Sequence, residues 1–237
     1  MTILLISIFT SNIQAANIGQ SAKNAAFSKW VYIPSILALG MAFTSVDKEI
    51  SSYASEKRPI FKTKERASSY GDFAAFYVSP ILALSTSIYV NYMQSRPFIY
   101  NFRSLPGTFS SYALNSVIKD KSGRIRPDDS NSESFPSSHT AIASSLGEHS
   151  QNEMSLFLPS KFQIYSILFI EGLIVSTAWS RLESKRHHFS DVLAGYAIGK
   201  FFSIFFREWL FSDDEQQKLV YLDTDLNTTK LGMLWTF

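Results

Sequence analysis

Apolar residues along the chain recur with helical spacing and fall into segments that are separated by polar and turn-forming residues. We predict six helices, over residues 30–46, 73–93, 108–119, 139–150, 162–179 and 190–211. A charged stretch from Asp47 to Arg66 separates the first two and is predicted to be a loop. The pattern therefore predicts an all-α, six-helix bundle over residues 17–211, and the length of 237 residues favours a single domain.

The two ends of the chain differ from this pattern. Residues 1–16 hold a short apolar core followed by small residues, which predicts a signal peptide cleaved near Ala15 or Ala16; an N-terminal helix is the alternative. Residues 212–215 are polar and are expected to end the last helix. Residues 219–237 then alternate between apolar and polar, so the tail 212–237 is predicted to contain a small β-hairpin.

Three segments, 73–93, 162–179 and 190–211, are long enough to cross a bilayer, whereas 108–119 and 139–150 are short and polar. Glu171 and Lys200 lie near the middle of the last two long segments, where a lone charge is costly in lipid. A short connection should make these two segments antiparallel neighbours, so we expect the two side chains to pair inside the bundle. The alternative is that they lie on a solvated face of a bundle outside the membrane.

Composition narrows the function only a little. The net charge is +2 without a long basic run, so a nucleic-acid partner is not indicated. There is no cysteine, which excludes disulfides and thiolate chemistry. Mean hydropathy is close to zero, which leaves both a membrane protein and a soluble bundle open.

Three short clusters carry the candidate chemistry. They are Lys119-x6-Arg126-Pro127, Pro136-Ser137-Ser138-His139 and Ser180-Arg181-x5-His187-x3-Asp191. Together they supply cations for the three equatorial oxygens of a transferring phosphoryl group, one histidine to attack phosphorus and another to protonate the departing oxygen. No dense set of carboxylate, histidine or cysteine metal ligands accompanies them, so we predict a phosphatase with no metal and no cofactor.

The predicted helices place these clusters together. The clusters fall at the end of the third segment, the start of the fourth and the junction of the fifth and sixth, so alternating helices bring them to one face of the bundle. His187 and Asp191 are four residues apart and share a face if a helix begins there. Ser137 to Thr140 precede a helical stretch, where backbone N–H groups can point at an anion.

Each of these residues also has a simpler interpretation. Lys119 and Arg126, taken alone, resemble ordinary solvated cations. His139 could be no more than a neighbour of a helix cap, and Asp191 could cap the last helix. His188 is the rival nucleophile, but only His187 has both spacings of the third cluster.

The three clusters resemble the signatures of the type 2 phosphatidic acid phosphatase superfamily, which covers lipid phosphatases, bacterial class A acid phosphatases and vanadium haloperoxidases. The resemblance extends over about residues 70 to 211. It implies a helical bundle of the phosphatidic acid phosphatase/haloperoxidase type and a phosphohistidine intermediate without a metal. Ser138 stands where the family usually has glycine, a residue that tolerates positive φ and close backbone approach; we expect activity to survive this change.

The resemblance also implies a role for each residue. His187 would be the nucleophile, Asp191 the group that orients it and His139 the general acid. Lys119, Arg126 and Arg181 would bind the phosphate, with Ser137 and the backbone N–H of Ser138 as further donors.

The motif residues would contact only the phosphate group of a substrate. The sequence therefore does not distinguish a membrane lipid from a small soluble phosphomonoester as the substrate. A soluble periplasmic acid phosphatase, a vanadium-dependent peroxidase and an inactive binding module are the alternative functions. The peroxidase is disfavoured by the short chain and the inactive module by the intact set of site residues. We expect a bacterial envelope protein, in the inner membrane or the periplasm, with its site facing the periplasm.

Overall fold

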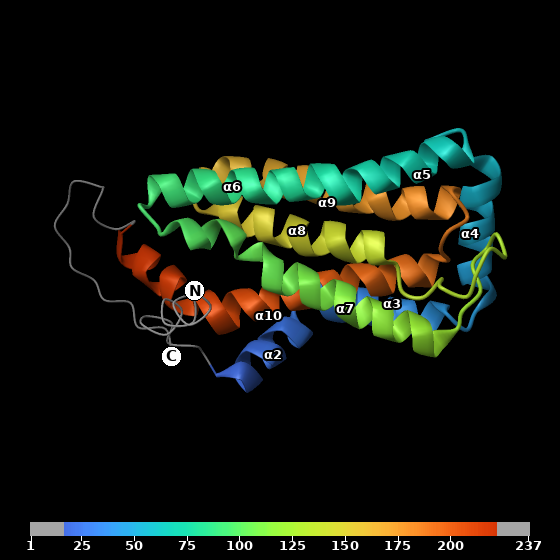
Figure 1. Cartoon of the computed structure of the whole chain (residues 1–237), viewed down its shortest axis with the longest axis horizontal. Coiled ribbons are helices and arrows are strands. Elements are labelled where there is room, and N and C mark those ends of the chain that lie inside the picture. The colour runs from blue at the N-terminus through green and yellow to red at the C-terminus, as the bar shows by residue number, and fades with distance from the viewer. Residues whose placement is uncertain (1–16, 222–237) are drawn as a thin grey trace, which may run out of the picture.

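The computed structural model describes residues 17–221, with side chains described as far as residue 211. These residues form a helical bundle and contain no strand (Figure 1). The elements are α2 (Ile18–Phe27), α3 (Lys29–Met41), α4 (Ser45–Lys57), α5 (Lys64–Phe73), the π-helix η1 (Ala74–Val78), α6 (Ser79–Met93), the 3-10 helix η2 (Phe98–Phe102), α7 (Ser104–Ser122), α8 (Ser138–Ser155), α9 (Ser160–Glu183) and α10 (Phe189–Tyr221). Because α5, η1 and α6 are continuous over Lys64–Met93, the described residues form eight helices besides η2.

Helix α8 lies at the centre of the bundle and packs against α6, α7, α9 and α10 (Figure 1). Its buried face is made largely of alanine, serine and glycine, which lets the neighbouring helices approach closely. On α10, Gly195 and Gly199 face the carbonyl oxygens of Ser137 and Ala141, at positions where a Cβ would overlap them. The polar composition of 139–150 therefore reflects a helix that is covered by other helices.

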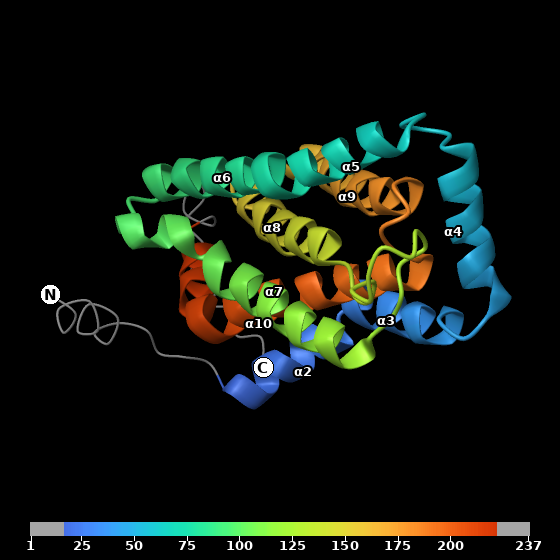
Figure 2. The same ribbon diagram turned by 45° about the vertical axis from the view of Figure 1, so that its right-hand side comes forward.

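Helix α4 lies across one end of the bundle (Figures 1 and 2). The chain bends by 98° between α3 and α4, and α4 then packs against α9 and α10. Asp47, in the first turn of α4, is buried despite its charge. This helix closes the end of the bundle at which the three sequence clusters meet.

Several predicted boundaries are corrected by the structure. The described residues contain two helices beyond the predicted six, α2 and α4, so the stretch from Asp47 to Arg66 is largely helical and only residues 58–63 form a loop. The predicted helix end at residue 211 is a kink, because Phe211 has non-helical φ and ψ and α10 continues to Tyr221. Residues 219–221 of the predicted β-hairpin are therefore helical, and the rest of the hairpin and the predicted signal peptide lie outside the described residues.

The predicted pairing of Glu171 and Lys200 is confirmed. The Lys200 Nζ donates to Glu171 Oε1 at 2.6 Å and to Glu148 Oε2 at 2.9 Å, and the lysine is fully buried. Tyr196 donates its hydroxyl proton to Glu171 at 2.9 Å, and Arg207 lies 3.3 Å from Glu148. Two cations and two carboxylates thus balance inside the bundle, as buried charges require.

Within the described residues, three helices are long and apolar enough to cross a membrane: Lys64–Met93, Ser160–Glu183 and Phe189–Phe211. Helices α3 and α4 together form a fourth candidate, broken at their bend. Of the two alternatives that the sequence left open, these lengths and the surface of the bundle support the membrane protein.

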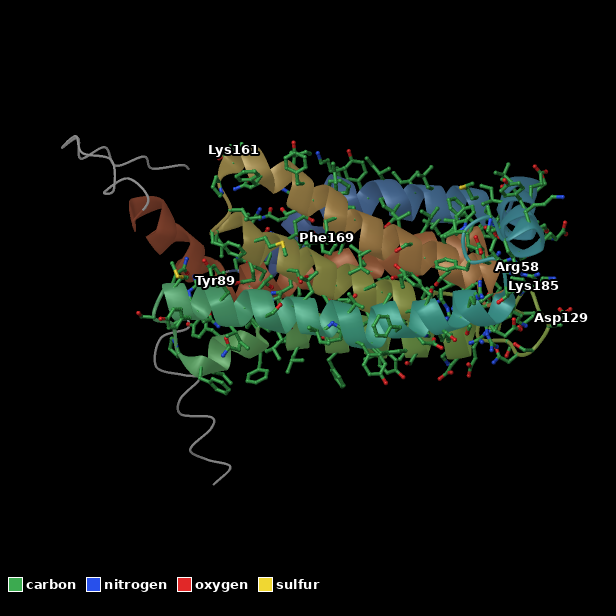
Figure 3. All side chains as sticks on the ribbon, turned by 90° about the horizontal axis from the view of Figure 1, so that it is seen from above. Arg58, Tyr89, Asp129, Lys161, Phe169 and Lys185 are labelled. Atoms are coloured by element: carbon green, nitrogen blue, oxygen red, sulfur yellow. The ribbon has the colours of Figure 1, made fainter. Side chains whose placement is uncertain are left out.

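That surface is apolar between two charged ends. Figure 3 shows Phe169 midway along the bundle, with Arg58, Asp129 and Lys185 at one end and Lys161 at the other. Phe169 is 59% exposed, and large apolar side chains of α3, α6, α7 and α9 are exposed in the same way. An exposed apolar surface of this extent is typical of a protein that contacts lipid.

Replacing Lys200 by methionine should lower the free energy of unfolding by roughly 3–5 kcal/mol, because Glu148 and Glu171 lose a shared buried cation. The measurement is thermal or denaturant unfolding in detergent micelles. Lys161→Met, which removes an exposed lysine, is the matched control and should change stability little. Equal effects of the two substitutions would contradict the assigned role of the buried cluster.

Candidate active site

The three sequence clusters meet at the end of the bundle that α4 crosses, where α7 and α9 end and α8 and α10 begin (Figure 2). The loop between α7 and α8 is fixed there by backbone hydrogen bonds. The Ser137 N–H donates to the Asp191 carbonyl oxygen at 3.0 Å, and the Ser134 N–H donates to the Arg124 carbonyl oxygen at 2.9 Å. The fold therefore brings the second and third clusters into direct contact.

His187 is buried in the connection between α9 and α10. Its Nδ1 lies 2.5 Å from the Ser134 carbonyl oxygen, which can only accept, so Nδ1 carries the proton. The neutral ring then has its lone pair on Nε2. Burial is the main cause that lowers the pKa of His187, to about 4, so the ring is neutral at pH 7 and suited to nucleophilic attack.

Asp191 lies near His187 but is not hydrogen-bonded to it, because the Nδ1–Oδ2 distance is 3.8 Å. Its Oδ2 instead accepts from the Ser134 hydroxyl at 2.5 Å and from the His188 N–H at 2.7 Å. The second of these bonds caps the first turn of α10, so Asp191 both stabilises the start of the helix and holds Ser134, the residue that anchors His187. Ser134, which supplies that anchor, lies outside the spacing of all three clusters and was not predicted.

Arg124 and Asp47 were also missed by the sequence analysis. One nitrogen of the Arg124 guanidinium donates to Asp191 Oδ1 at 2.6 Å and to the Ser190 hydroxyl at 2.7 Å. The other donates to Asp47 Oδ2 at 2.5 Å, and Asp47 also accepts from the backbone N–H of Ser190 at 2.7 Å. Arg124 is one of the unspecified residues of the first cluster, and Asp47 lies on α4, far from the clusters in sequence. No sequence motif therefore linked these two residues to the site.

His139 lies in the first turn of α8, and its Nε2 is 2.7 Å from Asp72 Oδ1. The ring of Phe76 contacts the imidazole edge-on, with ring centroids 4.8 Å apart. Burial, followed by the charge of Arg181, lowers the pKa of His139 to about 3, and Asp72 opposes this. Asp72 also was not predicted, because it lies on α5 and far from the clusters in sequence.

The predicted phosphate-binding cations crowd together at the same end. The Lys119 Nζ donates to the Glu133 carbonyl oxygen at 2.6 Å, and Arg126 Nη2 lies 3.6 Å from the Glu133 carboxylate. Burial and then the charge of Arg126 lower the pKa of Lys119 to about 8. Arg181 is buried and also contributes to lowering the pKa of Lys119. Because neighbouring positive charges disfavour the charged form of Lys119, a bound anion would be stabilised among these three cations.

Ser137 is the N-cap of α8, and its Oγ accepts from the N–H and the hydroxyl of Thr140. Its own hydroxyl proton is then left to donate. Ser138 is the first residue of α8 and has helical backbone, so no positive φ is required where the family usually has glycine. The ring of the rival His188 lies 3.2 Å from the Ile125 carbonyl oxygen, in the loop.

The chain resembles known proteins in sequence and in fold. Residues 102–214, which contain all three clusters, match the family model described as the PAP2 superfamily. The fold is similar to the crystal structure of the first transmembrane PAP2 type phosphatidylglycerolphosphate phosphatase from Bacillus subtilis, with a TM-score of 0.60 and 18% identity. The similarity covers 78% of this chain and 94% of that chain. No curated protein matches the chain.

The lowered pKa of Lys119 predicts a pH dependence of phosphate recognition. The lysine keeps its charge below pH about 8 and loses it as the pH rises through that value, so kcat/KM should fall there. Lys119→Arg should move this fall to higher pH, because arginine stays charged. The measurement is a pH profile of phosphate release; an unchanged profile in Lys119→Arg would show that another group titrates.

Proposed function

We propose that the protein is a phosphoric ester hydrolase of the PAP2 type, which hydrolyses the phosphate ester of a membrane lipid through a phosphohistidine on His187, without a metal. The match of residues 102–214 to the PAP2 superfamily model supports this proposal. The observation that carries the proposal is the placement of a neutral, anchored His187 and a second histidine, His139, at the same end of the bundle as three crowded cations. Such a set supplies the nucleophile, the acid and the charge stabilisation of phosphoryl transfer.

The reaction follows from these positions. The Nε2 lone pair of His187 attacks phosphorus, and the ester P–O bond breaks with its electron pair going to the leaving oxygen. His139 gives that oxygen its proton. Water then attacks the phosphohistidine, His139 takes a proton from the water, and the P–N bond breaks to return its electron pair to His187. Lys119, Arg126 and Arg181 bind the phosphoryl oxygens through both steps.

An open apolar groove near the site end of the bundle supports a lipid substrate. It has a volume of about 340 Å³ and lies between α3, α7 and α10, where its lining includes Phe135, Ala194 and Phe202. Phe135 precedes the second cluster directly, and Ala194 follows Asp191 by three residues. From Ala194 to Phe202 the groove follows about 12 Å of helix, which suits part of an acyl chain. The related solved structure, a phosphatidylglycerolphosphate phosphatase, points to the same class of substrate.

His187→Ala should abolish turnover on every phosphate ester, and excess EDTA should leave the wild-type activity unchanged. The measurement is phosphate release from a detergent-solubilised lipid phosphate and from p-nitrophenyl phosphate. Rapid quenching of the wild type should trap an acid-labile, base-stable phosphoenzyme that His188→Ala retains and His187→Ala lacks. Activity that disappears with EDTA and returns with Mg²⁺ would contradict the mechanism.

A substitution in the groove tests whether the substrate is a lipid. Leu39→Trp places a larger side chain at an exposed position that lines the groove and should raise KM for the lipid phosphate while p-nitrophenyl phosphate is hydrolysed as before. Equal effects on both substrates would favour the soluble phosphomonoester instead.

We further propose that the site end of the bundle faces the periplasm of a bacterial inner membrane. The apolar belt and the polar ends support a membrane position. The chain has no cysteine, so single cysteines report cleanly on sidedness. In intact cells a membrane-impermeant maleimide should label Ser132→Cys, in the exposed loop at the site end, and should not label Lys161→Cys at the other end. The opposite labelling would place the site in the cytoplasm.

A further inference from the structure

Asp72 joins two residues of the proposed machinery although it lies outside the segment that matches the family. A single oxygen, Oδ1, lies 2.7 Å from His139 Nε2 and 3.2 Å from Arg181 Nη1. The side chain of His139 is 19% exposed and that of Arg181 is 5% exposed, whereas that of Asp72 is 51% exposed. The carboxylate therefore reaches from solvent to two largely covered groups.

The helix that carries Asp72 is shaped to hold it there. Ser68, Asp72 and Phe76 recur at a spacing of four, and each contacts Arg181 or His139: the Ser68 carbonyl oxygen accepts from Arg181 at 3.5 Å, and the Phe76 ring packs on His139. Gly71 lies against Ser180 and Arg181, where a Cβ would overlap the Ser180 hydroxyl and crowd the Arg181 side chain. The π-helix η1 begins two residues after Asp72, and such bulges recur at functional sites.

We propose that Asp72 is a positioning residue for the general acid: its carboxylate accepts the Nε2 proton of His139 and fixes Arg181, so that Nδ1 of His139 exchanges the proton with the substrate. This inference rests on the proposed phosphatase function. In the first step Nδ1–H passes to the leaving oxygen as the P–O bond breaks, and in the second step Nδ1 takes a proton from the attacking water. The Nε2 proton stays in the bond to Asp72 throughout, so the ring returns to its starting state.

The charges around His139 explain why such a residue is required. Three charged or titratable groups face it: Asp72 from α5, Arg181 from α9 and His187 from the connection before α10. Burial, Arg181 and His187 all lower the pKa of His139, and among these neighbours Asp72 is the one that raises it. A histidine without this carboxylate would hold its proton less well and would be a poorer acid catalyst at neutral pH.

The simpler alternative is that Asp72 only ties α5 to α9 through Arg181. The two roles differ in their kinetic consequences. A purely structural tie would change all substrates alike, whereas a residue that supports the acid matters for leaving groups that need a proton and is dispensable for p-nitrophenolate, which leaves without one.

The test compares Asp72→Asn with wild type on an alkyl or lipid phosphate and on p-nitrophenyl phosphate. We expect kcat for the alkyl ester to fall by about 10²-fold and kcat for the aryl ester to change less than about 3-fold. The alkaline limb of the kcat profile for the alkyl ester should move to lower pH, because removal of the carboxylate lowers the pKa of His139. The fall of kcat/KM near pH 8 that is assigned to Lys119 should stay in place. Asp72→Glu should restore most of the activity, since it keeps the charge.

Glu65→Gln is the matched control, because it removes an exposed carboxylate from the same helix and should leave kcat unchanged for both esters. Thermal unfolding in detergent checks that the variants fold. If Asp72→Asn does not fold, Asp72→Ser is tested in its place. Equal losses on both esters with an unmoved pH limb would overturn the role of Asp72 and leave the phosphatase intact. Absence of phosphate release by the wild type from either ester would overturn the proposed function, and the inference with it.

Discussion

The arrangement of the site depends on one guanidinium shared by two buried carboxylates. Arg124 bonds to Asp47 on α4 and to Asp191 on α10, and neither carboxylate is exposed by more than 1%. Burial of one such charge is costly, and removal of the cation would leave two of them without compensation. The same contact fixes the helix across the end of the bundle, the loop after α7 and the first turn of α10 relative to one another. The position of Ser134, and through it of His187, follows from this contact.

The two histidines of the site are anchored in chemically different ways. His187 bonds to a backbone carbonyl, a neutral acceptor that fixes the tautomer without favouring a charge on the ring. His139 bonds to a carboxylate, which favours the protonated ring. A nucleophile must be neutral, which burial favours for His187. An acid must hold a proton, and Asp72 is the contact that raises the pKa of His139 against burial and the charge of Arg181. The same residue type thereby serves two purposes within one site.

The sequence predicted the residues that share a local spacing and missed those that act across the fold. Lys119, Arg126, His139, Arg181 and His187 could be predicted as site residues because the clusters record distances along the chain. Asp47, Asp72 and Arg124 were missed because their partners are brought to them only by packing of helices remote in sequence. The pairing of Glu171 with Lys200 was predictable because both lie at similar depths on adjacent antiparallel helices.

Helix α8 illustrates a further consequence of hiding polar residues at the centre of an apolar bundle. Its serines, His149 and Glu153 are covered by four neighbouring helices, and its own composition is not that of a segment that lipid would accept alone. During synthesis this helix therefore has to enter the bilayer together with partners that shield it, as a unit with α9 or with helices already inserted. The order in which the chain is made then matters for its biogenesis: α6 and α7 precede α8 and offer the first protective surface, and α10 completes it last.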